Sequence, residues 1–338
     1  MLSMMSVQPM QRFQKKYLRT IATSIFAIFI VTFGHGAQAQ NMAEPKKQSQ
    51  DQDAPSQQVL TPIPDLAYGA YQRGQFLTAL KLALERLKAD PKDASAMTLL
   101  GILSEQGIGT PRDLSKAVGW YRSGHENGDV NSTFAYAMAL IKGEGITKDQ
   151  AQGTALLRTA IDQGHPYAAY NLAFILMQSG EPDDQTRAAV MMRRAANHEI
   201  PEAQYALAII LKEGKGVPVQ AVEAAQLMER AALNGDVQAQ TEWAIMLFNG
   251  EGIPKDEAKA ARFFRRAAWK GNAIAQNRLA RLLMTGRGIP HNMIDAAAWH
   301  TLASGQGRTD DALDFEFKTL SPEDRLQVEK RAGEFVRQ

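Results

Sequence analysis

The strongest constraint on the fold is an internal period of about 36 residues in the middle of the chain. Pairs of glycines with one residue between them recur at steps of 36, 71, 36 and 36 residues. The pairs are Gly107–Gly109, Gly143–Gly145, Gly214–Gly216, Gly250–Gly252 and Gly286–Gly288. The long step is two periods, with a degenerate member at Gln178–Gly180. A period of this length predicts an array of small stacked units rather than one globular core.

A second set of positions keeps the same period and indicates what each unit contains. Small residues recur at Ala117, Gly153, Ala188, Ala224, Ala260 and Ala296, and a large apolar residue follows each of them three positions later. In the stretch 256–268, apolar residues recur at helical spacing. Asp256 is suited to cap the start of that helix, and Gly271 is suited to end it. A second helix is expected to end at Gly286, so each unit is predicted to be a pair of helices.

The composition suits closely packed helices better than a β-sheet. Aromatic residues are 7% of the chain, whereas sheets favour aromatic and branched side chains. Paired alanines such as Ala267 and Ala268 allow two helices to approach closely. One helix pair cannot bury its apolar face alone, so the pairs must stack on one another. The sequence therefore predicts an all-α fold, an α/α solenoid of stacked helix-pair repeats.

The glycine loops and the apolar positions together resemble the Sel1-like repeat, a relative of the tetratricopeptide repeat. The best match is Gly250–Gly271, which has the glycine pair, a spaced alanine, an aromatic residue, an alanine pair and a closing glycine. The resemblance covers residues 95–307 as six units, and it implies a right-handed superhelix. The third unit departs most, because Gln178 and Glu199 stand where other units have glycine.

The segments that flank the repeats have patterns of their own. Residues 65–94 resemble a degenerate tetratricopeptide helix pair. Residues 308–338 are expected to form capping helices, the last of them starting at Ser321 and Pro322. Residues 40–64 are rich in Gln, Pro, Ser and charges and have few large apolar side chains, which predicts a disordered spacer.

The first 39 residues have the pattern of a secretory signal peptide. A basic stretch between Arg12 and Arg19 precedes an apolar run at 21–33, and the tripeptide from Ala37 to Ala39 follows. The run has about 13 residues, whereas a membrane-spanning helix needs roughly 17–25. This favours cleavage after Ala39 over a retained membrane anchor. Together with the family resemblance, it implies export to the periplasm of a Gram-negative bacterium.

The residue inventory argues against several kinds of chemistry. The chain has no cysteine, which excludes disulfides and thiolate metal sites. One of its six histidines lies in the predicted signal peptide, and the other five sit in different units or registers without metal-ligand spacing. The glycine loops lack the third glycine and the preceding strand of a dinucleotide-binding loop, and they recur in every unit. We therefore expect no enzymatic activity, no cofactor, no metal and no small-molecule substrate.

The distribution of charge argues against nucleic-acid binding. Four of the 38 basic residues lie in the predicted signal peptide, which has no acid. The rest of the chain carries all 36 acidic residues and is close to neutral. Nucleic-acid binding requires a concentrated basic surface, which this balance does not predict.

One candidate for partner binding is a register of aromatic residues. Phe134, Tyr170 and Tyr205 occupy equivalent positions of successive units, and Thr241 and Asn277 continue the register. In a stacked solenoid these residues would line one groove, where tyrosines make good contact residues. The alternative is that the register is half-buried against the next unit.

The second candidate is a group of basic residues late in the array. Its members are Arg262, Arg265, Arg266, Lys270, Arg278, Arg281 and Arg287. Helical spacing places Arg262 and Arg266 on one helix face, and Arg278 and Arg281 on another. These residues are either a solvated face or a patch for an acidic partner loop or an anionic envelope polymer.

These features predict a non-enzymatic protein-binding scaffold or adaptor in the periplasm, which regulates a membrane sensor or an envelope complex. Its expected partners are envelope proteins or the periplasmic domains of membrane proteins, and the membrane is involved only during export. The alternative is an envelope-structural protein that binds peptidoglycan or an anionic polysaccharide through its basic C-terminal residues.

Overall fold

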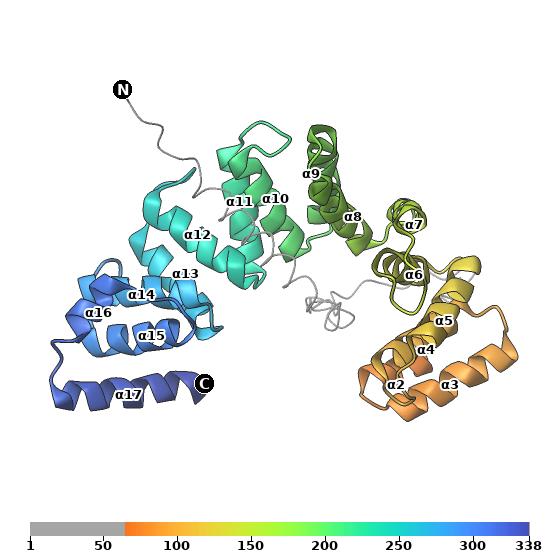
Figure 1. Ribbon diagram of the computed structural model, residues 1–338, viewed down its shortest axis with the longest axis horizontal. Coiled ribbons are helices and arrows are strands. Elements are labelled where there is room, and N and C mark those ends of the chain that lie inside the picture. Colours follow the sequence, from red (N-terminus) through yellow and green to blue (C-terminus); the bar gives the residue numbers. More distant parts are fainter. Residues whose placement is uncertain (1–64, 338) are drawn as a thin grey trace, which may run out of the picture. The chain divides into compact units, whose positions relative to one another are not determined.

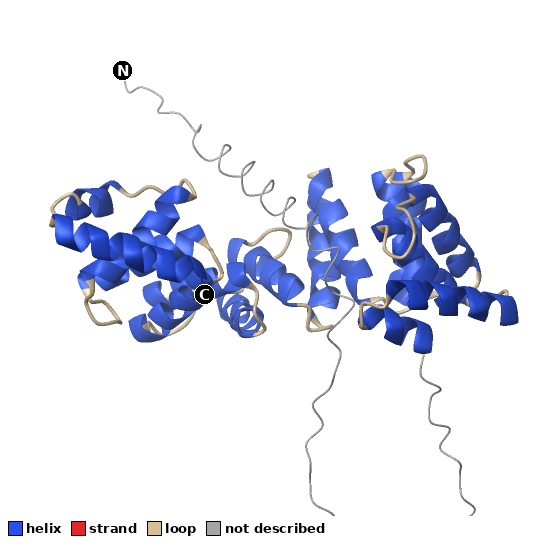
Figure 2. Cartoon of the chain, turned by 90° about the horizontal axis from the view of Figure 1, so that it is seen from below, coloured by secondary structure: helices blue, strands red, loops and turns tan. Residues whose placement is uncertain are grey.

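The computed structural model describes residues 65–337, and this part of the chain forms sixteen α-helices and no strand (Figures 1 and 2). The helices are α2 (Leu66–Gln72), α3 (Phe76–Ala89), α4 (Ala94–Gln106), α5 (Leu114–Glu126), α6 (Val130–Lys142), α7 (Gln150–Asp162), α8 (Pro166–Ser179), α9 (Pro182–Ala196), α10 (Pro201–Glu213), α11 (Ala221–Leu233), α12 (Val237–Asn249), α13 (Glu257–Trp269), α14 (Ala273–Thr285), α15 (Met293–Gly305), α16 (Asp311–Phe317) and α17 (Pro322–Arg337). The all-α prediction is confirmed. The predicted signal peptide and spacer, residues 1–64, lie outside the described residues.

The chain divides into two compact units, which comprise residues 1–82 and residues 83–338. In the first unit, the Asp65 carboxylate caps α2 by accepting a hydrogen bond of 3.0 Å from the backbone N–H of Tyr68. The rings of Tyr68 and Tyr71 stack with centroids 5.9 Å apart. Helices α2 and α3 lie where the sequence predicts a helix pair, and the tetratricopeptide character of that pair stays a prediction.

In the second unit, each helix from α4 to α15 packs against the next helix of the chain (Figure 1). Local signals set where these helices begin and end. Helix α12 ends at Gly250, which takes the left-handed conformation with φ +78°. The following loop ends at Asp256, whose carboxylate accepts a hydrogen bond of 2.7 Å from the backbone N–H of Lys259. These short-range caps confirm the predicted helix boundaries and produce a solenoid of stacked helix pairs.

The second glycine of the Gly-x-Gly loops allows neighbouring repeats to pack closely. Gly252 and Gly288 both have positive φ and lie directly against the first turn of a helix in the preceding repeat, at Ala221 and Glu257 respectively. A Cβ atom at either glycine would be too close to the backbone of that turn. The recurrence of the second glycine therefore has a packing reason.

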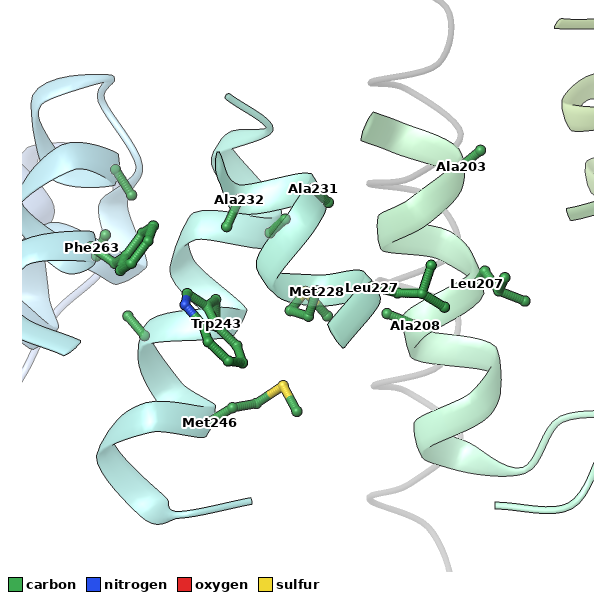
Figure 3. Packing of buried hydrophobic residues seen from close by; sticks show 14 of the residues in the cluster. Ala203, Leu207, Ala208, Leu227, Met228, Ala231, Ala232, Trp243, Met246 and Phe263 are labelled. Carbon is green, nitrogen blue, oxygen red and sulfur yellow. The ribbon is translucent and has the colours of Figure 1, made fainter. Parts of the chain in front are cut away.

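Alanines keep the helices close enough for a continuous apolar core. Ala267 is fully buried and Ala268 is 1% exposed, as the closely packed alanine pairs of the sequence predict. Figure 3 shows Leu227 of α11 pointing toward Ala208 of α10, where the small side chain leaves room for the larger one. The core therefore runs from helix to helix instead of closing around one centre.

The third repeat has a different loop and a strained residue. Helix α8 ends at Gly180, and α9 begins two residues later at Pro182, so the Gly-x-Gly loop of the other repeats is missing. Glu199 takes φ +59°, and it is the one non-glycine with positive φ among the described residues. Glu199 stands where other repeats have glycine. This unit therefore keeps the left-handed backbone conformation at that position, although its sequence departs from the pattern.

The last helices pack on the end of the array. Ser321 caps α17 by accepting a hydrogen bond of 3.1 Å from the Asp324 N–H, as the sequence predicts. Helix α17 packs on α15, where the rings of Phe335 and Trp299 stack with centroids 4.2 Å apart. Trp269 meets both rings edge-on. The apolar end of the last repeat is thereby covered.

Candidate functional site

The aromatic register lies at the junction between successive repeats. The three aromatic residues are each the fifth residue of their helix: Phe134 in α6, Tyr170 in α8 and Tyr205 in α10. If each repeat is counted from an even-numbered helix, these are the first helices of their repeats. Phe134 is 8% exposed and stacks on His165, the N-cap residue of the next repeat's first helix, with ring centroids 4.1 Å apart. Burial, and to a smaller extent the nearby His198, lowers the pKa of His165 to about 4.

Polar residues occupy the same junction in the outer repeats. Thr98 donates a hydrogen bond of 2.8 Å to the carboxylate of Asp129, and the Asn277 amide donates one of 2.9 Å to Asp310. Asp129 and Asp310 are each the N-cap residue of a following helix. The register thus joins each first helix to the start of a later one.

Little of the aromatic register is left for a partner. Tyr170 is 9% exposed and meets Phe174 edge-on, with centroids 4.8 Å apart, and burial raises the pKa of its hydroxyl. Thr241 and Asn277 are also buried. Tyr205 is half-buried and keeps part of its surface accessible. The geometry of Phe134 and Tyr170 is that of packing between repeats.

The structure divides the basic group into residues with partners and residues without. Arg287 forms a salt bridge with Glu257, and Lys270 donates a hydrogen bond of 3.0 Å to the carbonyl of Gly235. Arg266 lies over the ring of Phe263, 5.3 Å from its centroid. Arg262 and Arg265 are exposed on α13 and form no salt bridge within the described residues.

Arg278 and Arg281 line a pocket of about 340 Å³ at the end of the array. The pocket lies between α14 and the chain that leads into α16, and its other lining residues are Asn277, Arg308, Thr309, Asp310, Asp311 and Ala312. Three guanidinium groups therefore share one pocket with two carboxylates. Sequence reasoning identified Arg278 and Arg281 but missed Arg308 and Asp310, which lie after the last repeat.

Asp310 neutralises one of the three arginines. Its carboxylate accepts hydrogen bonds from Arg281 at 2.6 Å and from Asn277 at 2.9 Å. Burial alone would raise the pKa of Asp310, but these hydrogen bonds outweigh it and lower that pKa to about 2. Asp310 therefore remains ionised at neutral pH, and Arg281 is held in place beside it.

Arg278 has no such carboxylate. Neither its guanidinium group nor that of Arg308 forms a hydrogen bond or salt bridge within residues 65–337. Partial desolvation lowers the pKa of Arg278, and the positive charges of Arg281 and Arg308 lower it further, whereas the charge of Asp310 acts in the opposite direction. This part of the pocket therefore has guanidinium groups that an added anion could contact.

Two structural features do not occur among the described residues, namely a cluster of metal-binding side chains and a membrane-spanning helix. No three His, Asp or Glu side chains in residues 65–337 are placed to hold a metal ion. None of the described helices is both long and apolar enough to cross a membrane.

Comparison with known proteins identifies the repeat. Six stretches match the Sel1 repeat model, namely residues 94–129, 131–165, 166–199, 201–236, 237–272 and 273–307. Each matched stretch begins at or near the start of an even-numbered helix. The glycine loops instead suggest that each helix pair begins with an odd-numbered helix, so the two ways of dividing the array differ by one helix. The model covers more than half of the chain.

Solved structures agree with this match, and a short stretch of the chain is similar to a curated protein. A Sel1 repeat protein from Oxalobacter formigenes is 25% identical, with a TM-score of 0.59, over 70% of this chain and 94% of that one. The protective antigen c5321 of uropathogenic Escherichia coli, which displays an SLR fold, is 23% identical, with a TM-score of 0.51, over 80% of this chain and 67% of that one. A stretch of 55 residues is 42% identical to the uncharacterized protein NMB1327 of Neisseria meningitidis serogroup B, and it covers 16% of this chain and 12% of that protein. With six matching repeats and a solenoid of helix pairs, the chain belongs to the Sel1 repeat family.

Proposed function

We propose that this protein is a non-enzymatic scaffold that binds other proteins in the periplasm, as an adaptor or regulator of a membrane sensor or envelope complex. Sel1 repeat proteins generally act as scaffolds for protein–protein interaction, and their fold is typically non-catalytic. The periplasmic location rests on the signal-peptide pattern of residues 1–39. Export would bring the repeats to the compartment where such partners have their outer domains.

The observation that carries this proposal is the pre-organised surface of the repeats. Side-chain caps such as Asp256 and left-handed glycines such as Gly250 fix many of the helix ends, and the alanine pairs hold neighbouring helices close together. A surface built on such helices loses little conformational entropy when a partner binds. The described side chains include no cluster that resembles a metal centre, so recognition is the activity that this surface supports best.

Crosslinking in intact cells tests the proposal. The full precursor with a C-terminal tag would be expressed in a Gram-negative host, crosslinked and purified, beside a Tyr205→Ala variant. Tyr205 is chosen because it is half-buried, whereas truncating the buried Tyr170 would damage the junction between repeats.

The proposal expects one discrete envelope protein to be captured by the wild type. Loss of that protein in a variant that melts like the wild type would place the contact at Tyr205. Capture that is unaffected by this variant leaves the scaffold function intact and moves the contact elsewhere. Absence of any discrete protein would contradict the scaffold function.

The second candidate is an envelope-structural role. It is favoured by Arg262 and Arg265, which lie exposed on α13 without a salt bridge among the described residues. A polymer held by such charges should be released as salt rises from about 0.1 M to about 1 M, because the screening length falls from about 10 Å to about 3 Å. Retention of purified peptidoglycan or polysaccharide at high salt would contradict this electrostatic mechanism.

A further inference from the structure

The pocket at the end of the array contains two arginines whose side chains form no hydrogen bond or salt bridge with the rest of the described chain. Arg281 is explained by its contact with Asp310, since Asp310 also caps α16 through the backbone N–H of Leu313. The guanidinium groups of Arg278 and Arg308 make no hydrogen bond or salt bridge within the described residues, although both residues line the same pocket. Two like charges side by side are unfavourable unless an anion lies between or near them.

Comparison of the six repeats shows that these arginines are not a requirement of the repeat. The positions of Arg278 and Arg281 correspond to these pairs in the earlier repeats: Leu99 and Ile102, Ala135 and Met138, Asn171 and Phe174, Ala206 and Ile209, Glu242 and Ile245. The second position is apolar in all five. The last repeat therefore has Arg281 at a position that is apolar in the earlier repeats and Arg278 at a variable one, and the chain after it adds a third cation at Arg308.

We propose that this pocket binds a single carboxylate of a protein partner, held by the guanidinium groups of Arg278 and Arg308 while Arg281 and Asp310 keep the pocket open. This inference rests on the proposed scaffold function and names the chemistry that one of its contacts recognises. A guanidinium group donates two parallel hydrogen bonds that match the two oxygens of a carboxylate.

The two acids of the pocket favour a protein carboxylate over a polyanion. Asp310 and Asp311 leave an excess of one positive charge among the three arginines. One carboxylate balances that excess, whereas a polysaccharide or a phosphate with several negative charges would meet repulsion from both acids. The acids can also accept hydrogen bonds from the backbone N–H groups that accompany a carboxylate in a peptide.

The test is a titration of the mature protein with small probes, followed through the Nε–H resonances of the arginine side chains. The probes are acetyl-Gly-Glu-Gly-amide, its glutamine counterpart, inorganic phosphate and polygalacturonate. The Glu peptide is expected to shift the resonances of Arg278 and Arg308 in a saturable manner, and the Gln peptide is expected to leave them unchanged.

Variants locate the site. Arg278→Gln and Arg308→Gln should each weaken binding of the Glu peptide by about tenfold, because each removes a charge-assisted hydrogen bond. Neither side chain has a partner among the described residues, so both variants should melt like the wild type. Arg230→Gln, exposed on α11 and outside the pocket, is the matched control and should bind like the wild type.

Three outcomes would overturn the inference. They are equal shifts with the Glu and Gln peptides, tighter binding of phosphate or polygalacturonate than of the Glu peptide, and unchanged binding in both pocket variants. The scaffold function is tested separately by crosslinking. A discrete partner captured equally by wild type and Arg278→Gln would reject this pocket while leaving that function standing.

Discussion

At the scale of single residues, the glycine loops show how backbone conformation and close packing combine. Gly271 and Gly288 both have positive φ, at +82° and +67°. A Cβ atom at Gly271 would meet nothing within 4 Å, whereas one at Gly288 would overlap the carbonyl group of Glu257. Adding a side chain at Gly271 therefore has only the conformational cost of a positive φ. Adding one at Gly288 has both that cost and the steric cost of the overlap.

We predict that Gly288→Ala destabilises the protein more than Gly271→Ala does. The change at Gly271 should cost about 1–2 kcal/mol, the penalty of a left-handed conformation for a residue with Cβ. The change at Gly288 adds an overlap with backbone that cannot rotate away, and the total should reach about 3 kcal/mol or more. Chemical denaturation of both variants measures this difference, and equal losses would contradict the packing role of Gly288.

Asp236 gives a second residue-scale prediction, for the dependence of stability on pH. It caps α12 by accepting a hydrogen bond of 2.6 Å from the Ala239 N–H. Burial, assisted by the negative charge of Glu202, raises the pKa of Asp236 to about 6, although the hydrogen bond from the Ala239 N–H opposes the rise. The folded state therefore holds this proton more tightly than the unfolded chain, whose carboxyl has a pKa of 3.8. The stability that protonated Asp236 contributes is present below pH 3.8 and is lost as pH rises through about 6.

We predict that Asp236→Asn removes this loss. Asn is also a good N-cap residue, so the cap is retained while the buried charge is removed. The variant should match the wild type near pH 4 and exceed it by about 1–3 kcal/mol at pH 7. Urea denaturation across that range measures the difference between the two proteins, and a difference that does not vary with pH would refute the assignment.

At the scale of elements, the alanine pairs set the distance between helices. Ala267 and Ala268 on α13 are buried, whereas Ala258 on the same helix is exposed. We predict that Ala267→Leu combined with Ala268→Leu costs about 1–3 kcal/mol or more, because the added methyl groups find no space between the helices. Ala258→Leu is the control and should change stability by about 0.5 kcal/mol or less. Thermal melting compares the two, and wild-type-like melting of the double variant would show that this contact can expand.

The third repeat shows what happens to an element when its local signals are weak. Its first helix runs on to Gly180, and the next helix starts from Pro182 without the usual loop. The helix pair still forms, because the apolar positions of α8 and α9 pack as in the other repeats. Packing between helices therefore tolerates a shortened loop and a strained Glu199.

At the scale of the whole molecule, the proposed export would decide which partners the repeats can meet. We predict that the mature protein begins at Gln40, because the small residues Ala37 and Ala39 precede the expected cleavage site of the signal peptide. Intact mass measurement of the tagged protein from the periplasmic fraction of a Gram-negative host would check this. A full-length mass in the membrane fraction would support a retained anchor instead.

The sequence by itself determined the helix-pair repeat, its period and most helix ends. These depend on short-range physics, such as Asp256 capping a backbone N–H three residues away and Gly250 taking a left-handed conformation at a helix end. Such signals are complete within a few residues, so they can be read without knowing what lies beside them. The same holds for the capping helix that starts at Ser321.

Only the tertiary structure decided which residues of the candidate site are buried and which are exposed. Phe134 and Tyr170 have the composition of a binding groove, yet both are buried, and Phe134 stacks on His165 of the next repeat. Arg278 and Arg308 belong to no common sequence pattern, and they share a pocket because the chain after the last repeat turns back onto α14. Burial and charge pairing depend on neighbours that are distant in the sequence, and so the local pattern that fixes each helix leaves them open.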